Sequence, residues 1–140
     1  VRAAGMDLSI MIILGIAGAP GSMRHALATA HAINEIKPTY LSALSLMLYR
    51  GSELKAQFER GKFTPLPPYG LMEELKVIIE HLELPETDPM VFRSNHVSNY
   101  IRLAATLPRD KEKLLEDIDA SIRYLKQQKN WDIYNHDWSK

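Results

Sequence analysis

The fold is decided by the stretch LSIMIILGIAGAPGS at residues 8–22. Six of its first seven residues are apolar, with no alternation of polar and apolar positions. A short, uninterrupted apolar run predicts a strand that is covered on both faces, as in a parallel sheet. The glycine-rich turn after it leads into a helix that we expect from about Met23 to Ile36, with Ser22 as its N-cap. Strand, turn and helix form a first βα unit.

Further strands and helices follow in alternation. Apolar runs predict a second strand at residues 40–48 and a third at residues 90–93, while residues 94–107 are predicted to form a loop with at most a short helix. Apolar residues at helical spacing predict the helices, which we expect at about residues 53–60, 69–82 and 108–128.

This order predicts an α/β protein with about three parallel strands and right-handed crossovers. With helices on one face, the sheet would be a partial, half TIM-like βα barrel; with helices on both faces, it would be a small doubly wound domain. In either architecture, a ligand binds at the carboxyl ends of the strands. Those ends lie at residues 15–22, 48–52 and 93–99, so three glycine-rich or polar segments share one edge.

Composition narrows the function further. The 140-residue chain has 17 basic and 17 acidic side chains, whereas a dedicated nucleic-acid binder is usually strongly basic. No apolar run approaches the ~20 residues of a membrane helix, and nothing resembles a secretory signal. We therefore expect a cytoplasmic protein that binds neither nucleic acid nor membrane. The chain has no cysteine, so it contains no disulfide or thiolate ligand, and its histidines predict no metal site.

The first glycine turn matches neither common phosphate-binding motif. A Walker loop needs Gly-Lys-Ser/Thr before the helix, and a Rossmann turn needs GxGxxG, but here the glycines stand at positions 15, 18 and 21 without a lysine. Glycine still permits close approach of a ligand to the backbone. It is equally what a tight turn between a strand and a helix requires, so the residues leave both interpretations open.

Four segments together resemble a known family. ILGIAG at residues 13–18 resembles the fifth-strand motif of radical S-adenosylmethionine (SAM) enzymes related to oxygen-independent coproporphyrinogen oxidase. LSLMLYRGSEL at residues 44–54 is similar to the sixth strand and its turn, although Arg50 stands where proline is usual. FRSNHVSNY at residues 92–100 and LPRDKEKLL at residues 107–115 resemble tracts of a bacterial radical SAM subgroup. The resemblance covers about residues 1–128.

The resemblance implies a parent enzyme that holds SAM and a [4Fe-4S] cluster and cleaves SAM reductively to a 5′-deoxyadenosyl radical. The CxxxCxxC loop that holds the cluster is missing here, and cluster ligation requires thiolates. The chain therefore resembles the carboxyl-terminal half of such an enzyme, and its partner in the parent is the missing amino-terminal half-barrel. We expect the chain alone to be inactive and to hold neither cofactor firmly.

The same resemblance implies which residues would bind SAM. Ile13 would pack near the adenine, Gly15 and Gly18 would admit the nucleoside, and the backbone around Leu48 and Tyr49 would bond the adenine edge. The alternative for Ile13 is plain core packing, and for Tyr49 it is a partly exposed aromatic side chain on a turn.

The polar tract after the third strand supplies the expected substrate side of the site. Its candidates are Arg93, Asn95, His96 and Asn99, because functional side chains often lie in such loops. The alternative is a loop whose asparagine and serine side chains satisfy their own backbone. No catalytic residue is assigned.

The two ends add expectations about assembly. VRAAG at residues 1–5 is typical of the last turn of a helix, which suggests a piece of a longer protein, and the alternative is a disordered tag remnant. We expect one domain at residues 1–129 and a tail at residues 130–140 that carries Trp131 and Trp138. A half-barrel leaves the strand at residues 8–14 with an open edge, so self-association, as a dimer, is expected unless the tail covers the exposed face.

Two functions from other classes remain open at this level. The chain could be a self-contained small nucleotide-binding α/β module, or a structural or interaction domain without a small ligand. Binding of SAM or adenosine separates these two alternatives.

Overall fold

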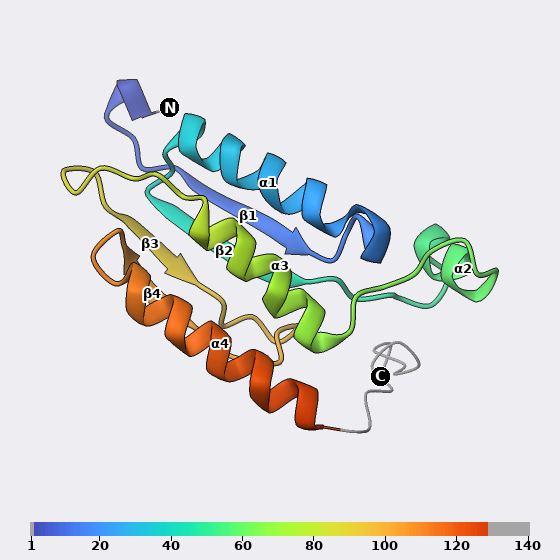
Figure 1. The fold of residues 1–140 in the computed structure, drawn as a ribbon. Helices are drawn as coiled ribbons and strands as arrows, with labels where there is room; N and C mark the ends of the chain where they lie inside the picture. Colours follow the sequence, from blue (N-terminus) through green and yellow to red (C-terminus); the bar gives the residue numbers. More distant parts are fainter. Residues whose placement is uncertain (1, 129–140) are drawn as a thin grey trace.

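The computed structural model describes residues 2–128 and contains one sheet and one main layer of helices (Figure 1). The elements, in chain order, are η1 (Arg2–Ala4), β1 (Ser9–Leu14), α1 (Gly18–Ile36), β2 (Tyr40–Ser45), α2 (Glu53–Glu59), α3 (Pro68–Glu80), β3 (Met90–Arg93), β4 (Ala104–Leu107) and α4 (Lys111–Gln127). The α/β class is therefore confirmed, and the third strand has the predicted bounds.

The sheet has four strands in the order β1-β2-β3-β4. β1, β2 and β3 are parallel, as predicted, but β4 pairs antiparallel with β3, with Arg93 opposite Ala104 and Met90 opposite Leu107. The prediction of a loop throughout residues 94–107 was therefore wrong. The four residues of β4 are too few for a periodic signal, and their strand conformation depends on hydrogen bonding to β3.

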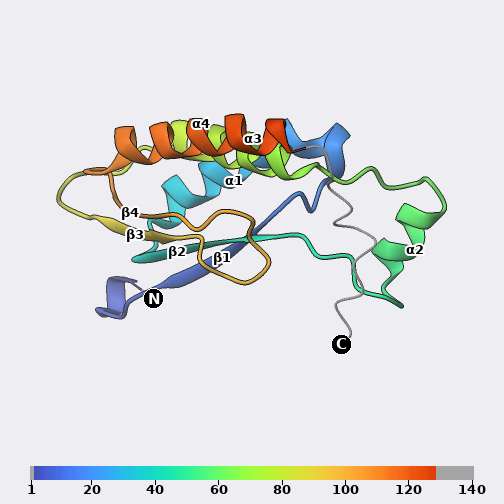
Figure 2. The same ribbon diagram turned by 90° about the horizontal axis from the view of Figure 1, so that it is seen from below.

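Helices α1, α3 and α4 cover one face of the sheet, and no helix or strand within residues 2–128 covers the other, which we call the open face (Figure 2). Alternate strand residues face the helices and are buried or half-buried, whereas their neighbours on β1, Met11 and Ile13, are exposed. Leu41 and Ala43 of β2 and Phe92 of β3 are fully buried under the helices. The expectation that β1 is covered on both faces was wrong, since only its helix side is covered among the described residues.

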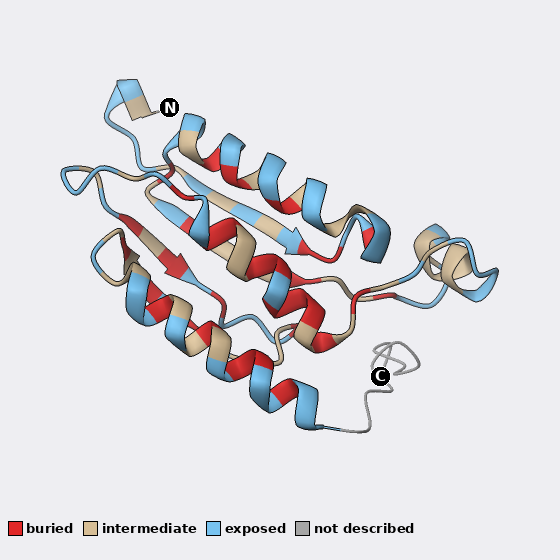
Figure 3. Ribbon diagram, viewed as in Figure 1, coloured by how far each residue is buried: buried red, intermediate tan, exposed pale blue. Residues whose placement is uncertain are grey.

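The core is centred on α3 and its contacts with α1 and α4 (Figure 3). Burying an aliphatic side chain stabilises a fold by roughly 1.5–3 kcal/mol, and α3 and α4 bury most of their predicted apolar stripes. These residues are Leu71, Leu75, Ile78 and Ile79 on α3 and Leu114, Ile118, Ile122 and Leu125 on α4. On α1, Ala26, Ala30 and Ile33 are buried, whereas Met23 and Leu27 are exposed.

The start of α1 and the end of β2 differ from prediction because of hydrogen bonds to distant segments. α1 begins at Gly18 rather than near Met23, because the Gly18 N–H bonds the Gly15 carbonyl and the Ala19 N–H bonds the Thr64 carbonyl. Ser22 is therefore inside the helix and is not its N-cap. β2 ends at Ser45 rather than at residue 48, because side chains of the segment after β3 bond its last residues in place of a strand.

Candidate functional site

Two adjoining hollows lie on the open face, toward the carboxyl ends of β1, β2 and β3. They share Leu44 and His96. The larger hollow has a volume of about 430 Å³ and is lined by Met11, Ser42, Ala43, Leu44, Arg93, Asn95, His96 and Val97. The smaller one, of about 180 Å³, is lined by Ile13, Leu44, Ser45, Leu46, Met47, Tyr49, His96 and Ser98. We call the two together the open-face groove.

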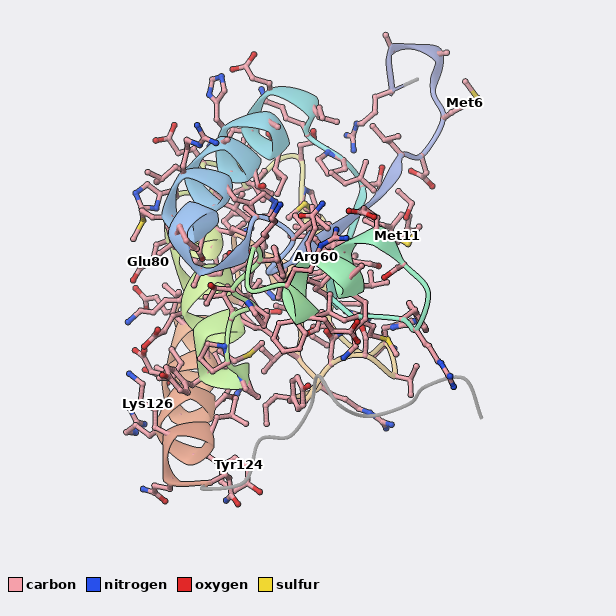
Figure 4. All side chains as sticks on the ribbon, turned by 90° about the vertical axis from the view of Figure 1, so that its right-hand side faces the viewer. Met6, Met11, Arg60, Glu80, Tyr124 and Lys126 are labelled. Atoms are coloured by element: carbon pink, nitrogen blue, oxygen red, sulfur yellow. The ribbon has the colours of Figure 1, made fainter. Side chains whose placement is uncertain are left out.

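Strand alternation and register bring the floor of the groove together. Successive side chains of a strand point to opposite faces, so Met11 and Ile13 lie on the open face while Leu14 is buried beneath the helices. Met11 lies opposite Ser42 and Ile13 opposite Leu44, and Ser42 lies opposite Arg93 of β3. Met11 projects on the far side of the sheet from Glu80 and Lys126 of the helix layer (Figure 4).

The segment after β3 is held against the end of β2 by side-chain hydrogen bonds. The Asn99 side-chain amide donates to the Ala43 carbonyl over 2.8 Å, and its carbonyl accepts from the Ser45 hydroxyl at 2.9 Å. The Ser45 N–H donates to the Ser98 hydroxyl over 3.1 Å. Asn99 thus holds the wall of the groove in place and does not line it, and its side-chain partners lie on β2 and not in the backbone of its own loop.

These bonds also determine which ring nitrogen of His96 carries the proton in the neutral form. The Ser98 N–H donates to His96 Nδ1 over 3.1 Å, and an N–H can only donate, so Nδ1 is an acceptor. The Ser98 hydroxyl, which already accepts from Ser45, lies 2.9 Å from the same nitrogen and donates to it. Neutral His96 therefore carries its proton on Nε2 and offers a hydrogen-bond donor there.

The groove carries one full charge among its lining residues. Arg93 is exposed and its Nη1 donates to the Phe92 carbonyl over 2.9 Å. No aspartate or glutamate lines either hollow. An arginine is protonated at all ordinary pH values, so the groove combines an apolar floor with a fixed positive charge.

The predicted SAM-binding residues fall into two groups. Ile13 and Tyr49 line the smaller hollow, and the Tyr49 hydroxyl donates to Met47 Sδ over 3.4 Å. Leu48 is 4% exposed and belongs to the buried apolar set. Gly15 and Gly18 line neither hollow. Of the predicted substrate-side residues, Arg93, Asn95 and His96 line the larger hollow, so the structure brings five of the nine candidates together.

Both turn glycines have a structural reason to be glycine. Gly15 and Gly18 have φ angles of +81° and +65°, which residues with a Cβ rarely adopt. A Cβ on Gly15 would lie 2.7 Å from Leu71 Cδ2, and one on Gly18 would lie 3.0 Å from the Thr64 carbonyl oxygen. Their interactions therefore match the interpretation of a tight turn packed against the neighbouring chain.

A buried carboxylate behind this turn was missed by the sequence analysis. Glu74 of α3 is 2% exposed and accepts hydrogen bonds from the Gly15 N–H at 2.9 Å and from the Ser22 hydroxyl. His25 Nδ1 lies 3.0 Å from the same carboxylate. The signal that could have revealed it is position: Glu74 follows Leu71 by three residues and precedes Ile78 by four, on the apolar stripe of α3.

Within residues 2–128, the structure contains no cluster of three potential metal ligands among histidine, aspartate and glutamate. The chain has no cysteine, so its residues do not fit an iron–sulfur cluster. No helix in the same range is long and apolar enough to cross a membrane.

The tail at residues 130–140, including Trp131 and Trp138, lies outside the described residues. No family model, curated protein or solved structure matches the chain.

Proposed function

We propose that the chain is the carboxyl-terminal half of a radical SAM enzyme and that its open-face groove contributes part of the SAM site and the substrate side. The observation that carries this proposal is the pair of hollows at the carboxyl ends of three parallel strands, which share His96. The parallel strands β1, β2 and β3, with helices on one face, resemble a wall of a half TIM-like βα barrel, in which the helices lie outside and the inner face is open when the opposite wall is missing. The antiparallel strand β4 has no counterpart in such a barrel.

The smaller hollow is the proposed place for the adenine of SAM. Its lining is largely apolar and includes Ile13, Tyr49 and residues 44–47, and it adjoins the larger hollow, where a substrate would lie. SAM, when bound in the parent, would supply hydrogen-abstraction chemistry after cleavage by one electron from a cluster that the missing half would hold. The residues of this chain position the two molecules, and Asn99 and Ser98 hold the groove wall in place.

SAM binding to the isolated chain tests the proposal. We expect weak but saturable NMR shifts at the Ile13 methyl groups on titration with SAM, because the other half of the barrel is missing, and weaker binding still in Ile13→Ala. Ile36→Ala is the matched control, because Ile36 at the end of α1 is 46% exposed and Ile13 is 43% exposed. Absence of SAM binding, or equal loss in both variants, would overturn the assignment of this hollow.

Two further measurements test the parent enzyme. The encoding gene is expected to contain a CxxxCxxC motif upstream of the codon for Val1. The chain itself, treated with iron and sulfide under anaerobic reducing conditions, is expected to form no cluster and no 5′-deoxyadenosine, because it has no thiolate ligand. An upstream sequence without the cysteines would count against the family.

The alternative functions predict different titrations. A self-contained nucleotide-binding module would bind adenosine and SAM in the same hollow with similar affinity and would have no upstream cysteine motif. A structural or interaction domain would bind neither molecule.

A further inference from the structure

We infer that the larger hollow binds an apolar molecule that carries a single anionic group, such as a carboxylate, and that Arg93 is its anion-binding residue. This inference rests on the proposed function in calling the ligand a substrate, but the binding itself does not depend on SAM. It names a ligand class for the substrate side of the groove.

The apolar part of the proposed ligand is inferred from the apolar side chains that line the hollow. Met11 and Val97 are 72% and 73% exposed, the two largest values among the exposed large hydrophobic side chains of the described chain. Both line the same hollow, with Leu44 between the two hollows. Covering such side chains removes apolar surface from water, which is worth roughly 25 cal/mol per Å². A ligand with an alkyl or ring portion gains this energy.

The anionic half follows from the charge of the lining. Arg93 forms no ion pair with any of residues 2–128, whereas Arg60, Lys76, Lys113 and Lys126 each have a carboxylate partner. The guanidinium has five N–H donors, and one bond, to the Phe92 carbonyl, is made by Nη1. Asn95 and the Nε2–H donor of neutral His96 add uncharged donors beside it.

The number of cationic residues that line the groove determines how many anionic groups the ligand is expected to carry. One arginine among the lining residues, without a lysine or a second arginine, matches one carboxylate or similar group. A polyanion such as a nucleic acid needs several cations along its path. A cationic ligand would meet Arg93 without a carboxylate to compensate it.

Three eight-carbon probes test the inference on the whole chain: octanoate, octanol and octylammonium, titrated separately and followed by NMR shifts at the Met11 and Val97 methyl groups. We expect octanoate to bind at least tenfold more tightly than octylammonium and more tightly than octanol. Equal binding of octanoate and octanol, or preferred binding of octylammonium, would overturn the inference.

Variants locate the anion-binding residue. Arg93→Met should weaken octanoate binding about tenfold and leave octanol binding unchanged, whereas Arg93→Lys should retain part of the octanoate preference. Arg102→Met is the matched control, since Arg102 is exposed in the same β3–β4 connection and lines neither hollow. Unchanged octanoate affinity in folded Arg93→Met, or the same loss in Arg102→Met, would contradict the role of Arg93.

The outcome is separable from that of the proposed function. SAM is expected to shift Ile13 in Arg93→Met as in the unmodified chain, because Arg93 does not line the smaller hollow. Octanoate selectivity without SAM binding would retain the anion site and reject the radical SAM assignment. SAM binding without octanoate selectivity would reject the anion site and retain the radical SAM assignment.

Discussion

Gly15 and Gly51 have nearly the same backbone conformation, with φ angles of +81° and +82°, but different surroundings. A Cβ on Gly15 would lie 2.7 Å from Leu71 Cδ2, whereas a Cβ on Gly51 would have no atom within 4 Å. The pair therefore separates the cost of the backbone conformation, which both substitutions share, from the cost of overpacking.

We predict that Gly15→Ala lowers the free energy of unfolding more than Gly51→Ala does. The difference should be roughly 1–3 kcal/mol, the usual cost of an extra methyl group in a packed site. Urea unfolding followed by circular dichroism measures both variants. Equal losses would mean that Leu71 moves aside without cost.

Glu74 and Glu73 are neighbours on α3 with opposite environments. Glu74 is buried and accepts from the Gly15 N–H and the Ser22 hydroxyl, so it ties the β1–α1 turn to α3. Glu73 is exposed and pairs with Lys126 at 2.7 Å on the surface. Buried acceptors matter more than surface ion pairs, because their removal leaves buried donors unsatisfied.

Glu74→Ala is therefore predicted to lower the free energy of unfolding by ~1–3 kcal/mol. Glu73→Ala should change it by no more than ~0.5 kcal/mol, as is usual for surface positions. Thermal and urea unfolding of the two variants measures both changes in the free energy of unfolding. A loss in Glu73→Ala as large as that in Glu74→Ala would contradict the assigned role of the buried carboxylate.

At the scale of elements, Asp110 links the end of β4 to the start of α4. Its carboxylate bonds the Arg109 guanidinium at 2.7 Å and accepts from the Thr106 N–H at 2.8 Å. The hydrogen bond from Arg109, followed by the one from Thr106, lowers the pKa of Asp110 from its usual 3.8 to about 2. Both bonds favour the charged form.

Because this pKa is lowered on folding, the stabilising contribution of Asp110 is fully present above the unfolded value of 3.8. It is lost as the pH falls through about 2. We predict that NMR titration of the Asp110 carboxyl carbon in the folded chain gives a midpoint near 2, and that Arg109→Gln raises it. Arg102→Gln should leave it unchanged. A midpoint at or above 3.8 in the unmodified chain would show that the two bonds do not hold the carboxylate.

At the scale of the whole molecule, β1 is the edge of the sheet and no described strand pairs with its outer side. Charged residues and proline usually protect an edge strand from pairing with another chain. The β1 sequence, SIMIIL, contains neither. The open face beside it exposes Met11 and Ile13. Near-zero net charge adds little repulsion between copies.

We therefore predict a dimer at micromolar concentration, with a mass twice the 15.9 kDa of the chain by sedimentation equilibrium. Met11→Lys should shift the equilibrium toward the monomer, because a lysine on an edge strand opposes pairing. Met23→Lys on α1 is the control, since Met23 is 61% exposed and lines a hollow formed with residues of α3 and not the open-face groove. A monomeric unmodified chain would contradict the prediction, and an equal effect of both lysines would place the interface elsewhere.

The sequence by itself determined the elements whose signal is local. The apolar run before Gly15 predicted β1, the bounds of β3 at Met90–Arg93 were correct, and the 3.6-residue stripes of α3 and α4 were confirmed. An apolar run or a 3.6-residue stripe depends only on which residues a strand or helix buries.

Only the tertiary structure decided the features that depend on distant segments. β4 exists because Ala104–Leu107 pairs with β3, and Glu74 is buried because the β1–α1 turn lies beside α3. The groove likewise needs three strands in register to bring Ile13, Leu44 and His96 together, from positions far apart in the chain. Hydrogen bonds and side-chain contacts between such segments leave no periodic trace in the sequence, which is why they could not be predicted from it.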